Sequence, residues 1–146
     1  MRYLLLAMLL STAASAYGPY DARLVRVVDG DTIELGVELW PGLVQRVNIR
    51  LDGINTPEKR INTKKIKDQG KRDRAICEKI AGVAATEFTQ AFVEKGSITV
   101  DDVRNGKFAG RVLGNVFVDG NSLADALLAS GHARLYGGGK RQPWCD

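Results

Sequence analysis

In the first part of the chain, apolar residues recur at every second position in three successive segments. One long segment follows in which they recur at helical spacing, and this order limits the folds that the chain can adopt. Apolar and polar residues alternate over residues 23–28 and 32–39, around an Asp-Gly-Asp turn at 29–31, which predicts a β-hairpin. A third run covers residues 44–54, after a Trp-Pro-Gly turn at 40–42. Its irregular start is typical of a β-bulge.

The second half of the chain predicts two helices and two further strands. Apolar side chains recur at helical spacing from residue 71 to 94, including Ile76 and Ile80, which predicts one long amphipathic helix. Strand-like runs follow at 97–103 and 111–118, and a short helix ends at Gly131. The order β-β-β-α-β-β-α predicts an α+β, mainly β fold: a five-stranded OB-fold barrel with an inserted long helix and a short C-terminal helix.

The first 16 residues have the three parts of a secretory signal peptide. Arg2 is the positive start, residues 3–10 are an apolar run, and Ala-Ser-Ala at 14–16 is a small-residue cleavage pattern. The apolar run is shorter than the roughly 20 residues of a membrane-spanning helix. We therefore expect residues 1–16 to be removed and residues 17–146 to form one domain. The product is expected to be a secreted or periplasmic monomer without stable membrane association.

Positive charge is concentrated in one loop-like segment. The formal net charge is +4, and residues 59–74 contain eight Lys or Arg residues against two Asp. Within it, Lys64, Lys65 and Lys67 are candidates for binding a polyanion such as nucleic acid. The alternative interpretation of such a run is a solvated loop.

Both cysteines, Cys77 and Cys145, lie in the part expected to be exported. An oxidising compartment favours a disulfide between them, which would tie the C-terminal tail to the long helix. Two free thiols are the alternative. A zinc site is not expected, because His132 is the only histidine and neither thiol has neighbours of ligand type.

Three short segments hold residues suited to phosphodiester chemistry. They are residues 29–32 (Asp-Gly-Asp-Thr), 50–58 (Arg-Leu-Asp-Gly-Ile-Asn-Thr-Pro-Glu) and 110–111 (Gly-Arg). The predicted turn after Arg50 brings Glu58 back within reach of it. A carboxylate can orient or deprotonate water, guanidinium groups can hold phosphate oxygens, and a hard cation can bind oxygen ligands.

In this order and spacing, the segments resemble the staphylococcal nuclease, or thermonuclease, family over about residues 22–136. The resemblance rests on residues 28–32, Arg50 with 53–58, 107–113 and 129–133. It implies that Arg50 and Arg111 hold the scissile phosphate and stabilise its transition state. It also implies that Glu58 is the general base or orients the water, and that the products end in 3′-phosphate.

The resemblance further implies one calcium ion, held by the Asp31 carboxylate, the Thr56 carbonyl and the side chain of Asn55. The family usually has aspartate where this chain has Asn55, and an amide offers one neutral oxygen instead of a carboxylate. Calcium is therefore either held weakly or replaced by another divalent ion. Phe108 stands where tyrosine is common, and either stacks on a nucleobase or fills the turn.

These features predict a calcium-assisted endonuclease that hydrolyses DNA, RNA or both with weak sequence preference. The alternative is a non-catalytic OB module that binds nucleic acid, which would not need Arg50, Glu58 and Arg111. A binder of some other anion is a further alternative, and would bind without turnover.

Overall fold

The computed structural model describes residues 18–107 and 109–146. The predicted signal peptide and Phe108 lie outside these described residues, so the structure does not place them. Within the described part of the chain, no helix is long and apolar enough to cross a membrane.

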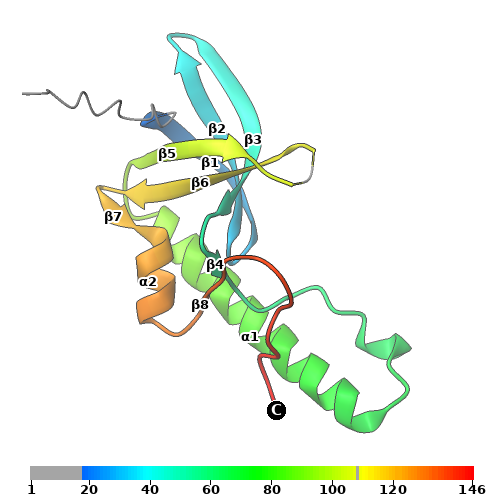
Figure 1. Ribbon diagram of the computed structural model, residues 1–146. Coiled ribbons are helices and arrows are strands. Elements are labelled where there is room, and N and C mark those ends of the chain that lie inside the picture. Colours follow the sequence, from blue (N-terminus) through cyan, green and yellow to red (C-terminus); the bar gives the residue numbers. More distant parts are fainter. Residues whose placement is uncertain (1–17, 108) are drawn as a thin grey trace, which may run out of the picture.

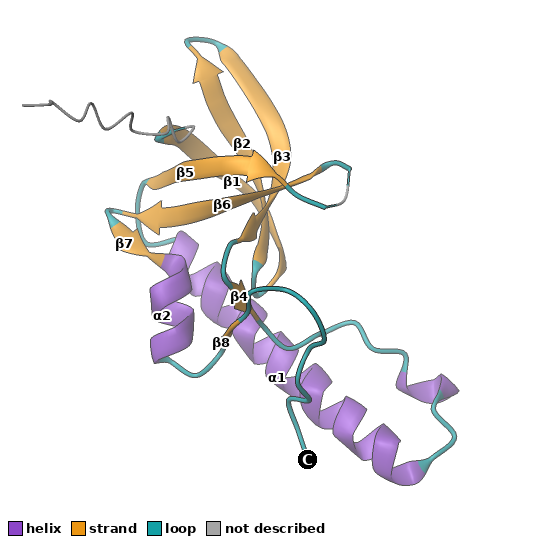
Figure 2. Ribbon diagram, in the orientation of Figure 1, coloured by secondary structure: helices purple, strands orange, loops and turns teal. Residues whose placement is uncertain are grey.

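Five long strands close into a barrel (Figures 1 and 2). They are β1 (Tyr20–Asp29), β2 (Thr32–Trp40), β3 (Leu43–Leu51), β5 (Ile98–Asn105) and β6 (Arg111–Val118). Neighbours in the order β3-β2-β1-β5-β6 are antiparallel, and a parallel pairing of β3 with β6 closes the ring. The predicted OB-type α+β fold is confirmed. The bulge expected at the start of the third run lies instead in β2, where the register shifts between Glu38 and Trp40, while β3 pairs without a shift from Val44 to Arg50.

The helices and the short strands gather at one end of the barrel. They are β4 (Ile54–Asn55), the 3-10 turn η1 (Thr63–Lys65), α1 (Gln69–Val93), β7 (Asn121–Ser122), α2 (Leu123–Ala129) and β8 (Arg134–Leu135). Asp68 caps α1 by accepting from the amide of Lys71 at 2.8 Å, and Ser122 caps α2 in the same way. The sequence did not predict β4, β7 or β8, because two-residue strands carry no period.

The hydrophobic core fills the barrel and continues under α2. Alternate residues of each strand point inward, and Leu123 and Leu127 of α2 pack onto the same cluster with no exposed surface. The largest fully buried side chains on the strands are Ile33, Leu35, Ile49, Leu51, Val100 and Val116.

Only the C-terminal half of α1 packs against the barrel. Its buried residues are Gly82, Ala85, Thr89 and Val93. Figure 1 shows the first half extending beyond the barrel, and there Ile76 and Ile80 are 41% and 66% exposed. The long helix is confirmed, but its packed face is made mainly of small residues and excludes these two isoleucines.

Small residues on α1 let two loop backbones approach the helix closely. A Cβ atom on Gly82 would lie 2.5 Å from the amide nitrogen of Lys59, and one on Gly30 would lie 2.8 Å from the Cβ of Ala85. The hydroxyl of Thr89 donates to the carbonyl of Gly30 at 2.6 Å. Gly30 has no positive φ, so close contact with α1, and not turn geometry, is what requires glycine there.

The C-terminal tail, residues 137–146, folds back along α1 (Figure 1). Cys145 forms a disulfide with Cys77 of α1, across a Cα–Cα distance of 6.3 Å. Arg134 donates to the carbonyl of Pro143 at 2.9 Å and lies over the Trp144 ring, 4.2 Å from its centroid. The predicted disulfide is confirmed, and it ties the tail to the long helix.

Replacing both cysteines by serine should lower the free energy of unfolding. The bond joins residues 68 positions apart, and the chain-entropy model gives about 4 kcal/mol for a loop of that length. Urea unfolding of the double variant and of the oxidised protein would measure the difference. An unchanged midpoint and slope would show that the bond does not constrain the unfolded chain in this way.

The substitution Gly82→Ala should destabilise the protein, although alanine is ordinarily better than glycine inside a helix by about 1 kcal/mol. The added methyl group would meet the backbone of Glu58 and Lys59, and overpacking of this kind costs roughly 1–3 kcal/mol. Gly70→Ala is the matched control, since a Cβ there would meet only an Asp68 side-chain oxygen at 3.6 Å. Equal stabilisation of both variants in urea unfolding would contradict the close contact at Gly82.

Candidate active site

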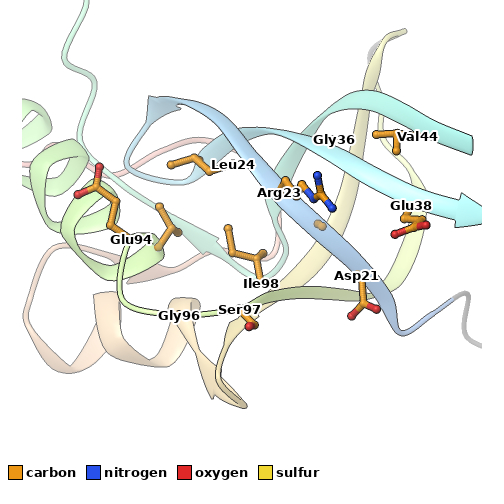
Figure 3. Close-up of a pocket in the computed structure, with 12 residues that line it drawn as sticks. Asp21, Arg23, Leu24, Gly36, Glu38, Val44, Glu94, Gly96, Ser97 and Ile98 are labelled. Carbon is orange, nitrogen blue, oxygen red and sulfur yellow. The ribbon is translucent and has the colours of Figure 1, made fainter. Parts of the chain in front are cut away.

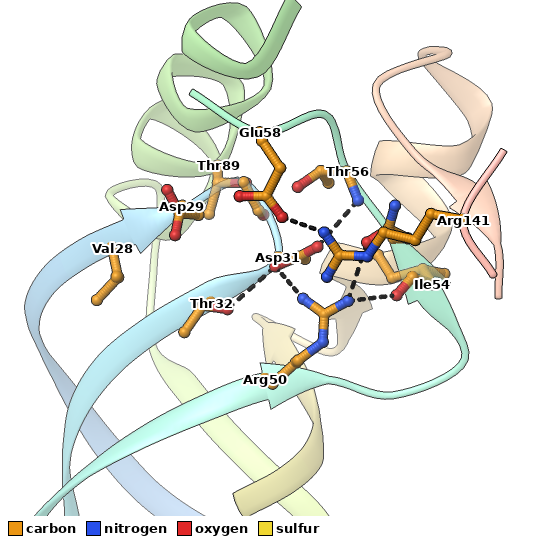
Figure 4. Close-up of polar contacts among 12 residues, drawn as sticks. Val28, Asp29, Asp31, Thr32, Arg50, Ile54, Thr56, Glu58, Thr89 and Arg141 are labelled. Carbon is orange, nitrogen blue, oxygen red and sulfur yellow. Dashed lines mark hydrogen bonds and ion pairs between the residues drawn. The ribbon is translucent and has the colours of Figure 1, made fainter. Parts of the chain in front are cut away.

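Asp31 is the buried centre of a polar cluster at the end of the barrel (Figure 4). The residue is 4% exposed. Its Oδ2 accepts from the amide of Thr56 at 2.9 Å, and its Oδ1 accepts from the hydroxyl of Thr32 at 3.0 Å and forms an ion pair with Arg50. One carboxylate therefore joins the β1–β2 turn, the end of β3 and the segment after β4.

Arg50 spans the turn that separates β3 from β4. Its Nη1 pairs with Asp31, and its Nη2 donates to the carbonyl of Ile54 at 3.3 Å and to Oδ1 of Asn55 at 3.1 Å. The side chain is only 12% exposed. Its orientation is set before any ligand arrives, so little conformational entropy is left to lose when it binds an anion.

Arg111 begins β6 and projects from the same face of the sheet as Arg50. The parallel pairing sets Arg111 beside Asn48, and Leu113 beside Arg50. Residues paired in register share a face, and ordinary strand spacings put the two arginine Cα atoms about 8 Å apart. Two arginine side chains on one face at this separation can reach one phosphate group.

Glu58 is held at its backbone while its side chain remains partly open. Its amide donates to Oε1 of Glu78 on α1 at 3.3 Å. Its carboxylate forms an ion pair with Arg141, and the side chain is 44% exposed. Glu58 therefore combines a fixed position with access to water, which a proton acceptor needs.

Arg141 is a member of the cluster that the sequence did not indicate. It comes from the tail, 83 positions after Glu58, and Figure 4 shows its side chain directed toward Glu58 and Asp31. Partial burial works against its charge, but the hydrogen bond to Glu58 and the charges of Glu58 and Asp31 raise the pKa of Arg141 above its usual value. Only the predicted disulfide indicated that the tail returns toward α1.

The basic loop lies apart from this cluster. Lys64 and Lys65 are in η1 and Lys67 follows it, all three exposed. Figure 1 places η1 beside the first turn of α1, away from β4 and β8. Arg72 of α1 anchors the loop by donating from Nε to the carbonyl of Ile66 at 2.9 Å.

Two polar residues near the site have partners elsewhere. Asp52 pairs with Arg104 of β5 at 2.5 Å. The ring of His132 lies 5.0 Å from that of Phe88, as expected of a histidine at the edge of the core.

The donors expected to bind a metal ion lie close together. Asp31, Asn55 and Thr56 are all at most 5% exposed, and carboxylate, amide and carbonyl oxygens are the ligands that hard divalent cations prefer. Only Asp31 among them is anionic, and within residues 18–107 and 109–146 no group of three or more His, Cys, Asp or Glu side chains is placed to hold a metal ion. The residues fit calcium by donor type, in a site of low negative charge.

A cavity of about 630 Å³ lies elsewhere, between β1, β2 and the turn from α1 to β5 (Figure 3). Its lining includes Asp21, Glu38 and Glu94, with Arg23 as the one cationic side chain among the lining residues. None of the cluster residues borders it. This acidic lining does not suit a polyanion, so the polar cluster is the better candidate site.

Comparison with known proteins places the chain in a family. A family model described as staphylococcal nuclease homologue matches residues 48–143, about two thirds of the chain. No curated protein matches the chain. The matched range contains every cluster residue named above except Asp31 and Thr32, and the family indicates a nuclease or an OB module that binds nucleic acid. The chain belongs to the staphylococcal nuclease homologue family.

Proposed function

We propose that the protein is a calcium-assisted endonuclease that hydrolyses phosphodiester bonds in DNA, RNA or both. The observation that carries the proposal is the joint placement of a fixed guanidinium, Arg50, and a partly open carboxylate, Glu58, around the buried Asp31. A module that only binds nucleic acid needs cations, but it does not need a carboxylate beside them. A hydrolase does need one, to accept a proton from water or to orient it, and this favours the enzyme over the binding module.

Arg50 and Arg111 would hold the non-bridging oxygens of the scissile phosphate. Negative charge on these oxygens increases as the transition state forms, so fixed guanidinium groups bind the transition state more strongly than the substrate. The ion pair with Asp31 keeps Arg50 from reorienting during the reaction.

Glu58 would accept a proton from the attacking water or orient it. The water oxygen would form a new bond to phosphorus while the bond to the 5′ oxygen of the next nucleotide breaks. That oxygen would take up a proton from solvent and leave as a 5′-hydroxyl, and the other fragment would end in 3′-phosphate. Asp31, Asn55 and Thr56 would hold the cation, which when bound supplies positive charge next to the phosphate oxygens.

Sequence-independent contacts would dominate binding. The exposed Lys64, Lys65 and Lys67 lie away from the reacting groups and would contact the backbone of a long substrate. OB barrels bind single strands mainly through charge and stacking, so we expect weak sequence preference. The Cys77–Cys145 disulfide supports our proposal that the protein acts in the periplasm or outside the cell.

Glu58→Gln should lower kcat by about 10²- to 10⁴-fold, because an amide cannot accept the proton. The test measures cleavage of single-stranded DNA, duplex DNA and RNA, each with calcium, magnesium or chelator. Arg50→Ala and Arg111→Ala should also lose activity by orders of magnitude. Arg50→Ala is the less clean variant, since it leaves Asp31 buried without its partner.

Glu87→Gln is the matched control for this test, being the same change at an exposed position of α1. It should retain full turnover. Near wild-type turnover in a folded Glu58→Gln protein would contradict the mechanism. Binding of all three nucleic acids without cleavage by the wild-type protein would instead favour the non-catalytic module.

Asn55→Asp should lower the calcium concentration that gives half-maximal activity, because calcium affinity rises with the charge of its ligands. Calorimetric titration of calcium into the wild-type protein and the variant gives a readout that does not depend on activity. Asn62→Asp, the same change at an exposed position, is the control for added negative charge. Unchanged calcium binding in Asn55→Asp would remove position 55 from the metal site.

A further inference from the structure

The tail adds a guanidinium to a site whose other members come from the barrel and the segment after β4. We propose that Arg141 binds the substrate phosphate on which Glu58 acts, and that the Cys77–Cys145 disulfide holds it in place for this. The inference rests on the proposed function, and it assigns a role in substrate binding to a residue outside the pair Arg50 and Arg111.

The first support is the geometry of the guanidinium. Arg141 pairs with Glu58 through Nη1, and its side chain is 44% exposed. A guanidinium carries five N–H donors in a planar fork, so one edge can hold a carboxylate while another holds a phosphate oxygen. Arg141 can therefore stay on Glu58 and bind the phosphate at the same time.

The second support is that the chain is anchored on both sides of Arg141. Before it, the amide of Tyr136 donates to the carbonyl of Gly53 at 2.8 Å, and the Tyr136 hydroxyl donates to the carbonyl of Gly139 at 2.8 Å. After it, Pro143 accepts from Arg134 and Cys145 is bonded to Cys77. These anchors fix the position of Arg141 before substrate arrives, which reduces the entropy lost on binding.

The third support is the balance of charge. Asp31 and Glu58 carry two negative charges in the cluster, and Arg50 neutralises the first of them. Without Arg141, the carboxylate of Glu58 would face the phosphate uncompensated, and the two negative charges would repel each other. Arg141 supplies the compensating charge at the atom where the repulsion would arise.

The fourth support is a cavity next to the guanidinium. It has a volume of about 220 Å³, and its lining includes Asn55, Tyr136, Lys140, Arg141 and Trp144. Three cations, with Arg134 as the third, and two aromatic rings beside the expected metal ligand Asn55 suit a phosphate with an attached nucleoside. The lining thus matches a nucleic-acid strand that continues past the scissile phosphate.

The test compares Arg141→Ala, Arg141→Lys and Arg23→Ala. KM and kcat are measured on a short single-stranded DNA, and the Kd of a fluorescein-labelled single-stranded DNA is measured by anisotropy in chelator. Arg141→Ala should raise KM and Kd by about tenfold, on the order of one charged hydrogen bond. Arg141→Lys should recover part of this loss, because lysine keeps the charge without the fork.

Arg23→Ala is the matched control, since it makes the same change at an exposed position of β1 that lines the separate acidic cavity. It should change Kd by at most about twofold, in the range of a single exposed charge. Equal effects of Arg23→Ala and Arg141→Ala would overturn the proposal, and so would tighter binding by Arg141→Ala, which would mean that Arg141 obstructs the site. If the wild-type protein binds but does not cleave, the proposed function fails, while the Kd comparison still tests Arg141.

A double-mutant cycle tests the tether. Replacing Cys77 and Cys145 by serine, in protein shown to be folded by circular dichroism, should raise Kd about as much as Arg141→Ala. Combining the changes should add little, because both remove the same contact. Unchanged Kd in the serine variant would overturn the role of the disulfide, and full additivity would show that the two changes act separately.

Discussion

The buried ion pair between Asp31 and Arg50 is the interaction on which the site depends. It joins a turn near the start of the fold to the end of β3, and the same carboxylate holds the amide of Thr56. Removing one member of such a pair leaves an uncompensated buried charge, which costs roughly 3–5 kcal/mol. Arg50, Asn55 and Thr56 keep their relative positions because Asp31 lies between them.

The second constraint on the site is the close packing of two loops against α1, which is possible because the helix has small side chains there. Gly82 lies against the backbone at Glu58, and Ala85 and Thr89 lie against Gly30. These contacts fix how closely both loops approach α1. Larger residues at positions 82 and 85 would push both loops away from the helix.

Much of the fold and of the candidate site was predictable because the relevant signals are local. Each period-two run, and the one helical run, is recognised from a short continuous segment of sequence. Residues 50–58 likewise place Arg50, Asn55 and Glu58 around a single predicted turn. In the structure Arg50 contacts both Asp31 and Asn55, and the roles of Arg50, Asn55 and Glu58 in catalysis stay proposals. The exposure of Ile76 and Ile80 could not be read in this way, since it depends on where the barrel ends along α1.

Arg141 was missed for the opposite reason. Its contact with Glu58 joins residues 83 positions apart. The tail around Arg141 has no hydrophobic period, so the sequence does not predict the direction of its side chain. The disulfide was predictable from the compartment expected for the protein, but a disulfide between Cys77 and Cys145 does not say which tail residue turns toward the site. Contacts of this kind depend on the path of an irregular segment, which only coordinates describe.

The span of the contact between Glu58 and Arg141 bears on the order in which the molecule is assembled. A chain made from its amino terminus has β1, β2 and β3 available early, but the barrel cannot close until β6 pairs with β3. The Glu58–Arg141 pair forms later still, because Arg141 follows Glu58 by 83 residues and also follows β6 along the chain. Such non-local contacts form slowly, after their loop-closure entropy has been overcome. The cluster therefore reaches its full set of charges only after residue 141 has been synthesised and the tail has folded back onto Glu58.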